Sequence, residues 1–242
     1  MPLSLDKNAA RIAAMFDDIA PHYDFLNHFL SLNIDRRWRK KLVRQVAQQH
    51  PATILDVATG TGDLAIALHR QTRAAITAVD ISGGMLEIAK RKTTGGAWDT
   101  GRNPLPAIHW LRAPAEALPF PAGAFHAVTV AFGVRNFENL SKGLQEMYRV
   151  LQPGGIIAIL EFASPARFPV KQLYRFYFHF ALPLIGRLFS KHRTAYRYLP
   201  ASVSQFPQCN DFLQLLQQAG FKDTQYQSLS GGIAMLYGGT RE

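Results

Sequence analysis

Short apolar runs alternate with helix-like segments along most of the chain. The runs that match buried strands are TILDVA (53–58), AAITAVD (74–80), AIHWLR (107–112), AFHAVTVAFG (124–133) and GGIIAILEF (154–162). Helical periodicity fills several of the stretches between them, at 62–70, 83–92 and 141–151. This alternation predicts an α/β fold, in which a parallel sheet carries helices on both faces and ligands bind beyond the carboxyl ends of the strands.

The two ends of the chain add helices and a pair of strands to this centre. Residues 9–50 show helical spacing of apolar side chains, with a break predicted at Pro21. Near the C-terminus, a helix over 211–221 stops at Gly220, and strands follow near 223–229 and 232–239. We expect one domain over 1–242, divided into an N-terminal helical cap (1–50), a cofactor-binding core (51–161), a lid insertion (162–208) and a C-terminal helix with strands (209–242).

Length and composition fit one domain. With 242 residues and 48% hydrophobic content, the chain can bury a full α/β core. The N-terminus has no continuous apolar block typical of a secretory signal, and no uncharged apolar run is long enough to span a bilayer. Cys209 is the single cysteine, which excludes an internal disulfide and a cysteine-based zinc cluster. We expect a cytoplasmic protein without a metal centre.

The net charge of +10 is unevenly placed. No Asp or Glu occurs from Phe162 to Asn210, a stretch that contains Arg167, Lys171, Arg175, Arg187, Lys191, Arg193 and Arg197. A second basic cluster comprises Arg36, Arg37, Arg39, Lys40, Lys41 and Arg44. Each cluster could be a solvated helix face, but together they favour an anionic partner, either nucleic acid or a phospholipid surface.

The stretch ILDVATGTGDLAI (54–66) indicates a nucleotide-type ligand. Gly60, Gly62 and Ala65 satisfy G-x-G-x-x-A after a strand, and Asp80 ends the next strand, 20 residues beyond Gly60. A dinucleotide would fit this pattern, and so would S-adenosylmethionine (SAM), which has the same ribose diol but no pyrophosphate. Asp56 and Asp63 place carboxylates around the turn, which disfavours a diphosphate and favours a sulfonium with an α-ammonium group.

Two of these acids have structural alternatives. Asp56 could orient the loop by accepting backbone N–H bonds. Asp80 could be the N-cap of the following helix.

Longer segments carry a resemblance to a known family. ILDVATGTGD, AVDISGGMLEIAKRK, APAEALPFPAGAFHAVTVAFGVRNFEN and EMYRVLQPGGIIAILEF resemble the successive motifs of class I SAM-dependent methyltransferases. FDDIAPHYDFLNHFLSL (16–32), FGVRNFEN (132–139), AYRYLPASVSQFP (195–207) and the closing GGIAMLYGG narrow the resemblance to the ubiquinone and menaquinone biosynthesis C-methyltransferases. The resemblance implies a Rossmann-like class I methyltransferase fold with a seven-stranded, mostly parallel sheet, an N-terminal helical cap and an inserted helical lid.

The resemblance also implies a cofactor, SAM, and residues that bind it. Thr61 and its glycine loop would hold the methionyl part and Asp80 the ribose hydroxyls, and the segment with Pro114, Ala115 and Glu116 would flank the adenine through backbone contacts. Relatives usually have Asn at the position of Pro114, and proline lacks a backbone N–H. They usually have Ser where this chain has Ala131.

The implied reaction is methyl transfer to a ring carbon of a polyprenylated quinol, which becomes nucleophilic as a phenolate. We expect Arg135 to stabilise the phenolate oxygen and Asn136 to orient the ring. The alternative for Arg135 is a structural salt bridge to Glu138 or Glu161. The general base is open between Tyr23 and a water bound to Arg135.

The remaining hypotheses concern partners. The aromatic segment 173–189 suits a lid whose basic fringe touches an anionic membrane surface, which predicts a cytoplasmic protein peripherally associated with the inner face of the membrane. A core helix and a homodimer interface are the alternatives for this segment.

A non-catalytic SAM-binding scaffold of a quinone-biosynthesis complex is the second functional hypothesis. An RNA methyltransferase is a third, but the chain lacks common RNA-binding motifs, and we expect no nucleic-acid partner.

Overall fold

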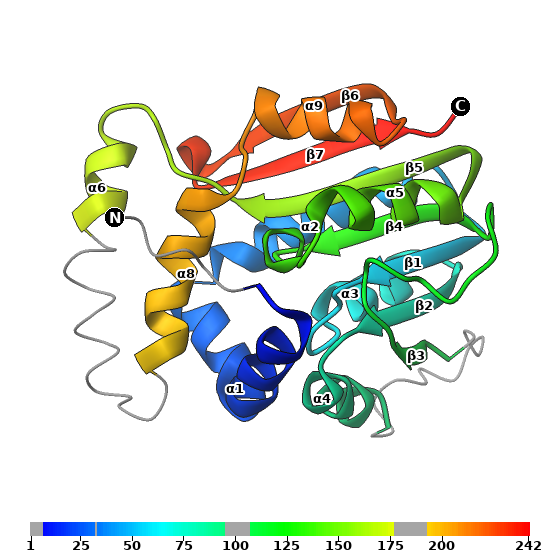
Figure 1. Ribbon diagram of the computed structural model, residues 1–242, viewed down its shortest axis with the longest axis horizontal. Coiled ribbons are helices and arrows are strands. Elements are labelled where there is room, and N and C mark those ends of the chain that lie inside the picture. The colour runs from blue at the N-terminus through cyan, green and yellow to red at the C-terminus, as the bar shows by residue number, and fades with distance from the viewer. Residues whose placement is uncertain (1–6, 32, 95–106, 177–192) are drawn as a thin grey trace.

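A computed structural model describes residues 7–31, 33–94, 107–176 and 193–242 of the chain. Seven strands form one sheet in the order β3-β2-β1-β4-β5-β7-β6 (Figure 1). Their bounds are β1 Thr53–Val57, β2 Ala75–Asp80, β3 His109–Arg112, β4 Phe125–Ala131, β5 Leu151–Phe162, β6 Lys222–Leu229 and β7 Ala234–Thr240. The first five strands pair in parallel, whereas β7 runs antiparallel to both β5 and β6. The predicted seven-stranded, mostly parallel sheet is confirmed.

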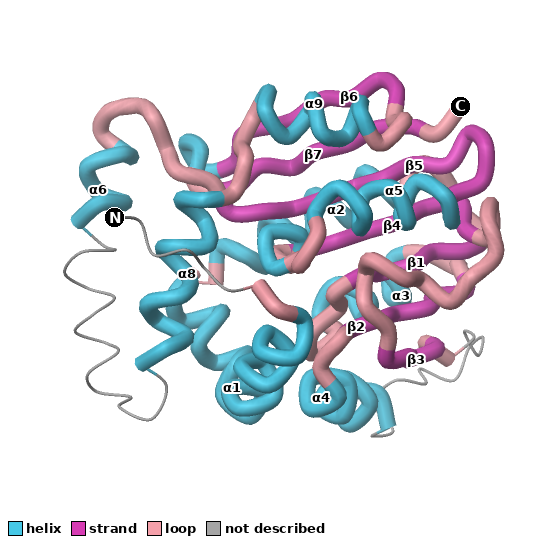
Figure 2. Tube along the Cα trace, in the orientation of Figure 1, coloured by secondary structure: helices cyan, strands magenta, loops and turns pink. Residues whose placement is uncertain are grey.

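Helices cover both faces of this sheet (Figure 2). The helices are α1 Ala9–Leu30, α2 Ile34–Ala47, α3 Asp63–Gln71, α4 Gly83–Thr94, α5 Leu140–Val150, α6 Val170–Phe176, α8 Arg193–Gln205 and α9 Asn210–Gln218. Short 3₁₀ turns are η1 Val134–Asn136 and η4 Ser230–Gly232. One apolar core lies between the sheet and α5 with α9, and the other lies between the sheet and α2 with α3.

Alternate residues of the central strands enter opposite cores. In β1, Leu55 and Val57 pack toward α5 and α9, while Ile54 packs toward α2 and α3. All three are at most 1% exposed, so this strand is buried on both faces, as its continuous apolar run predicts. Because the central strands are buried, they hold the polar residues at the carboxyl ends of β1, β2 and β4 along one edge of the sheet.

The predicted break at Pro21 is wrong, because α1 continues through this proline to Leu30. Pro21 is exposed, so its ring does not disturb the packing of α1. On either side of it, Ile19, Ala20 and Tyr23 pack with Met85 of α4 in a small apolar cluster. We attribute the continuous helix to this packing, which offsets the hydrogen bond that a proline removes.

Strand β5 also begins earlier than predicted. It starts at Leu151, and the turn residues Pro153 and Gly154 lie within it, at a shift in the β4–β5 register. Most of the predicted lid segment 173–189 lies outside the described residues, which cover α6 and α8 on either side of it. Among the described helices, none is both long and apolar enough to cross a bilayer.

Candidate active site

A cleft of about 920 Å³, open to solvent, lies at the carboxyl ends of β1, β2 and β4. Helix α1 lies beside α4 along this edge of the sheet (Figure 1) and contributes Ile12, Phe16 and Tyr23 to the lining. The glycine loop after β1 and the turn η1 after β4 supply other walls. The cleft is therefore at the place where a parallel α/β sheet binds its ligands.

The glycine loop has the backbone that its sequence predicts. Gly60 and Gly62 have φ of +57° and +81°, in the left-handed region that favours glycine. The Gly60 amide donates to Asp80 Oδ2 at 2.7 Å. A Cβ at Gly62 would lie 2.7 Å from Cη2 of Trp110, so only glycine lets the loop pack against that ring. Gly60, Thr61 and Asp80 all line the cleft, whereas Gly62 supports the loop from behind.

Asp80 lies at the end of β2 with both oxygens held by backbone amides. Oδ2 accepts from Gly60 and Oδ1 accepts from Ser82 at 2.8 Å. Burial raises the pKa of this carboxyl above its ordinary value. Ser82, rather than Asp80, caps the N-terminus of α4, because Ser82 Oγ accepts the Met85 amide of this helix at 3.0 Å. A carboxylate has about four lone-pair sites, so Asp80 retains acceptors for a ribose diol.

Asp56 holds the loop through side chains rather than through the backbone amides that its structural alternative assumed. Its two oxygens accept from the hydroxyls of Thr59, at 2.6 Å, and Thr129, at 2.7 Å. Burial raises the pKa of Asp56 to about 6. Asp56 therefore ties the loop to β4 and carries less negative charge near neutral pH than an exposed aspartate.

Asp63 is neutralised by its neighbours. Its oxygens lie 2.8 Å from Lys92 Nζ and 3.4 Å from an Arg39 nitrogen. Lys92 also pairs with Asp24 of α1 at 2.6 Å, and Asp24 accepts from the Thr61 hydroxyl at 2.5 Å. Repulsion of a diphosphate by Asp56 and Asp63 is thus weaker than the sequence argument assumed, because one is partly protonated and the other is paired.

The segment 114–116, which was expected to flank the adenine, lines the cleft at every residue except Pro114. Ala113, Ala115 and Glu116 line the cleft, whereas Pro114 is exposed and is not part of the lining. The predicted adenine contact at Ala115 therefore has a suitable position, whereas the Pro114 side chain faces solvent.

Arg135 adopts the salt bridge that was its structural alternative. It is 5% exposed, and its guanidinium lies 2.6 Å from Glu161 Oε1. It also donates to the Phe132 carbonyl oxygen and to the hydroxyl of Ser202 of α8. Arg135 does not line the cleft, so the predicted direct contact with a phenolate oxygen is not present in this arrangement.

Asn136 and Tyr23, by contrast, both face the cleft. Asn136 Oδ1 accepts the hydroxyl of Tyr198 of α8 at 3.0 Å. Burial raises the pKa of both Tyr23 and Tyr198. Both phenols therefore stay protonated near neutral pH, which argues against Tyr23 as the general base.

Several residues of the site were not assigned a role from the sequence. Asp17 of α1 accepts from the Ser82 hydroxyl at 2.5 Å and from the Gly84 amide at 2.8 Å, and so fastens α1 to the start of α4. Arg39 lines the cleft, although it belongs to the basic cluster of α2. The helical periodicity of α2 could have indicated this inward position, because Arg39 lies on the same face of the helix as the apolar Trp38 and Leu42.

The cleft combines the features expected of a SAM site: a carboxylate at the end of β2, a tight glycine loop, an acid-rich lining and the small apolar residues Ala113 and Ala115. This fold and cleft define a class I SAM-dependent methyltransferase. A SAM-dependent methyltransferase from Thermotoga maritima superimposes with a TM-score of 0.60 at 15% identity, covering 96% of this chain and 100% of the other.

The chain belongs to the ubiE/COQ5 methyltransferase family, whose model matches residues 4–241. It is 46% identical over 239 residues to the ubiquinone/menaquinone biosynthesis C-methyltransferase UbiE of Geotalea daltonii, covering 98% of this chain and 99% of the relative. It is 43% identical over 242 residues to the demethylmenaquinone methyltransferase of Bacteroides fragilis, covering 99% of this chain and 96% of the relative. The family decides the ligand in favour of SAM over a dinucleotide.

Proposed function

We propose that the chain catalyses SAM-dependent C-methylation of a polyprenylated quinol in ubiquinone/menaquinone biosynthesis, with demethylmenaquinol as its main acceptor. Family membership over residues 4–241 is the observation that carries this proposal. The cleft supports it, because Gly60, Thr61 and Asp80 of the expected donor site line the same cavity as Tyr23 and Asn136 of the expected acceptor site.

The donor side of the cleft is formed by the glycine loop and the end of β2. Asp80 would accept hydrogen bonds from the ribose hydroxyls of SAM, Thr61 and Gly60 would contact its methionyl part, and Ala113 and Ala115 would flank its adenine. When bound, SAM supplies a methyl group made electrophilic by the adjacent sulfonium. The walls of the cleft hold the two reactants in line, which removes much of the entropic barrier to transfer.

The acceptor side is lined by α1 and η1, and α8 supports η1 from outside the cleft through Tyr198 and Ser202. Asn136 and the protonated Tyr23 orient the quinol oxygen and stabilise its phenolate by hydrogen bonding. Arg135 acts from behind as a positioning residue: its pairing with Glu161 and Ser202 fixes the turn η1 that carries Asn136. Water accepts the phenolic proton.

A turnover assay tests this function. The purified protein is incubated with SAM and a short-chain demethylmenaquinol, and in parallel with a methoxy-polyprenyl-benzoquinol, and products are identified by mass spectrometry. We expect a methylated naphthoquinol as the main product. Binding of SAM without methylation of either quinol would contradict catalysis, and faster methylation of the benzoquinol would contradict the preferred acceptor.

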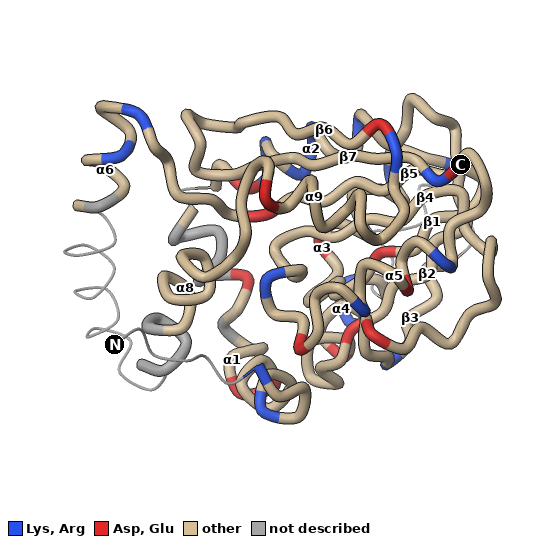
Figure 3. The backbone as a smooth tube through the Cα atoms, turned by 45° about the horizontal axis from the view of Figure 1, so that its top comes forward, with Lys and Arg blue, Asp and Glu red and all other residues tan. Residues whose placement is uncertain are grey.

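Helix α6 supports peripheral membrane contact as a further part of the proposal. Phe168, Leu173 and Phe176 are 80%, 66% and 63% exposed, in a stretch that also carries exposed Arg167 and Lys171. Figure 3 shows α6 at one end of the molecule, with basic positions at its start and just before it. Exposed aromatic groups with adjacent cations suit the boundary of an anionic bilayer, where the prenyl tail of the acceptor resides.

Flotation with vesicles tests this contact. We expect binding to vesicles that contain phosphatidylglycerol, loss of binding as salt rises, and weaker binding when Phe168, Leu173 and Phe176 are replaced by serine. A triple replacement of the exposed Arg36, Arg37 and Lys40 of α2 is the matched control for loss of general charge. No flotation at low salt would contradict membrane contact through α6.

A further inference from the structure

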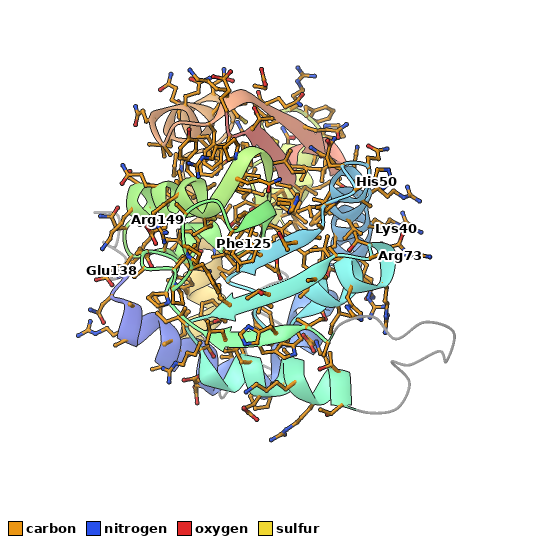
Figure 4. All side chains as sticks on the ribbon, turned by 90° about the vertical axis from the view of Figure 1, so that its right-hand side faces the viewer. Lys40, His50, Arg73, Phe125, Glu138 and Arg149 are labelled. Atoms are coloured by element: carbon orange, nitrogen blue, oxygen red, sulfur yellow. The ribbon has the colours of Figure 1, made fainter. Side chains whose placement is uncertain are left out.

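Arg39 occupies an unusual position in the cleft. Among the described residues that line it, five carry carboxylates, namely Asp56, Asp63, Asp80, Glu116 and Glu138, and Arg39 is the single basic one. Arg39 is 7% exposed, whereas its neighbours Arg37 and Lys40 on α2 are exposed. Figure 4 shows Lys40 pointing away from the molecule. Arg39 therefore differs from the rest of the basic cluster, because its charge is directed inward.

The guanidinium of Arg39 is held through one of its nitrogens. Nη1 lies 2.5 Å from Asp35 Oδ2 and 3.4 Å from Asp63 Oδ2. Asp35 is completely buried, and the Arg39 guanidinium lies 5.6 Å from the centre of the Phe132 ring. These contacts fix the orientation of the guanidinium plane. They engage neither Nε nor Nη2, the two donors that form the planar fork for a carboxylate.

SAM requires such a partner at this end of the cleft. Its methionyl group ends in an α-ammonium and an α-carboxylate, and the surrounding acids suit only the ammonium. An enclosed carboxylate without a partner would weaken binding strongly. Arg39 lies beside Asp63, the first residue of α3, which directly follows the glycine loop that contacts the methionyl group.

We propose that Arg39 binds the α-carboxylate of SAM through Nε and Nη2, and that Asp35 is the residue that positions it. This inference rests on the proposed use of SAM. Because Asp35 and Phe132 fix the guanidinium before the ligand arrives, little side-chain entropy is lost on binding. Arg39 is thus a specificity determinant for the amino-acid end of the cofactor.

Decarboxylated SAM provides the test, because it keeps the nucleoside, the sulfonium and the ammonium but lacks the carboxylate. Isothermal titration of the wild-type protein should show binding of SAM about 10- to 100-fold tighter than that of the decarboxylated ligand, the value of one or two charge-assisted hydrogen bonds. In Arg39→Gln, SAM affinity should fall by a similar factor, while the affinity for decarboxylated SAM should change less than about threefold.

Controls separate this contact from general damage to the site. Lys40→Gln removes an exposed charge from the same helix and should leave both affinities unchanged. If Arg39→Gln fails to fold because Asp35 is left unpaired, the double variant Asp35→Asn/Arg39→Gln removes the buried charge. Arg39→Lys keeps a cation without the fork and should retain only part of the preference.

Two outcomes distinguish the inference from the function on which it rests. If the wild-type protein binds SAM with equal affinity to the decarboxylated ligand, or if the Arg39 variants keep the wild-type preference, Arg39 does not bind the carboxylate. If the wild-type protein binds neither ligand, the proposed use of SAM fails instead.

Discussion

The two sides of the cleft are held together in different ways. On the donor side, defined by Asp56, Gly60, Thr61, Gly62 and Asp80, carboxylates on β1 and β2 hold the glycine loop, and the Thr61 hydroxyl donates to Asp24 of α1. On the acceptor side, defined by Tyr23, Arg135, Asn136, Glu161 and Tyr198, side chains pair across more than 20 residues of sequence. The backbone of the donor-side loop follows from its own glycines, at positive φ, whereas no local motif sets the acceptor side, which depends wholly on partners that the fold brings together.

The largest effect is expected on the acceptor side. Arg135→Met leaves the fully buried Glu161 without its cation and should lower the free energy of unfolding by about 3–5 kcal/mol. Urea unfolding measures the loss. Arg149→Met, which breaks the more exposed pair with Glu146, is the control and should cost less. Equal losses in the two variants would show that the Arg135–Glu161 pair does not organise the acceptor side.

The next effect concerns Asp56 on the donor side. Its pKa is raised from 3.8 to about 6 in the folded protein, so the folded state holds this proton more tightly than the unfolded chain does. The stabilising contribution is therefore full below pH 4 and is lost as pH rises to about 6, by up to about 3 kcal/mol. Asp56→Asn lacks this titration.

Urea unfolding at pH 4 and pH 7 tests the sign. The stability of the wild-type protein relative to Asp56→Asn should fall between the two pH values. If the stability of the wild-type protein relative to Asp56→Asn instead rose with pH, the folded protein would favour the ionised form of Asp56, and its full negative charge would have to be counted in the site.

A smaller effect is expected in the glycine loop, where a comparison of two glycine variants separates steric crowding from backbone strain. Gly62→Ala and Gly154→Ala both place a side chain at positive φ, +81° and +78°, but only the Cβ at residue 62 would meet Trp110, since that at residue 154 has nothing within 4 Å. Gly62→Ala should therefore be more destabilising by about 1–2 kcal/mol in thermal or urea unfolding. Similar losses would show that the loop tolerates a side chain against Trp110.

The smallest of these effects in free energy concerns ligand binding. Asp80→Asn should weaken SAM binding by about tenfold, because one ribose acceptor is replaced by an amide. Isothermal titration measures the change, with Glu87→Gln on the exposed face of α4 as the control. Unchanged affinity in Asp80→Asn would remove Asp80 from the donor side.

The same difference explains what the sequence could predict. The strand ends, the glycine loop and Asp80 follow from short motifs and apolar periodicity, and the structure places them as expected. The position of Arg135 just after β4 was correct, but only the fold shows that Glu161 of β5 and Ser202 of α8 take up its donors. Local sequence contains no information about which of two glutamates, Glu138 or Glu161, lies within reach.

Two other differences have tertiary causes. Pro21 carries a strong local signal for a break, yet the packing of Ile19 and Ala20 against Met85 of α4 keeps α1 continuous. Arg39 looks like one member of an exposed basic cluster until the rotation of α2 turns it toward Asp35 and the cleft. In both cases a contact with another element decided the outcome, and no motif reports such a contact.

A crystal structure of the complex with S-adenosylhomocysteine tests the central claim most directly. We predict that the ribose hydroxyls lie within hydrogen-bond distance of the Asp80 carboxylate and that the amino-acid end lies beside Thr61. A nucleoside bound away from the carboxyl ends of β1 and β2, or a ribose without contact to Asp80, would contradict the account.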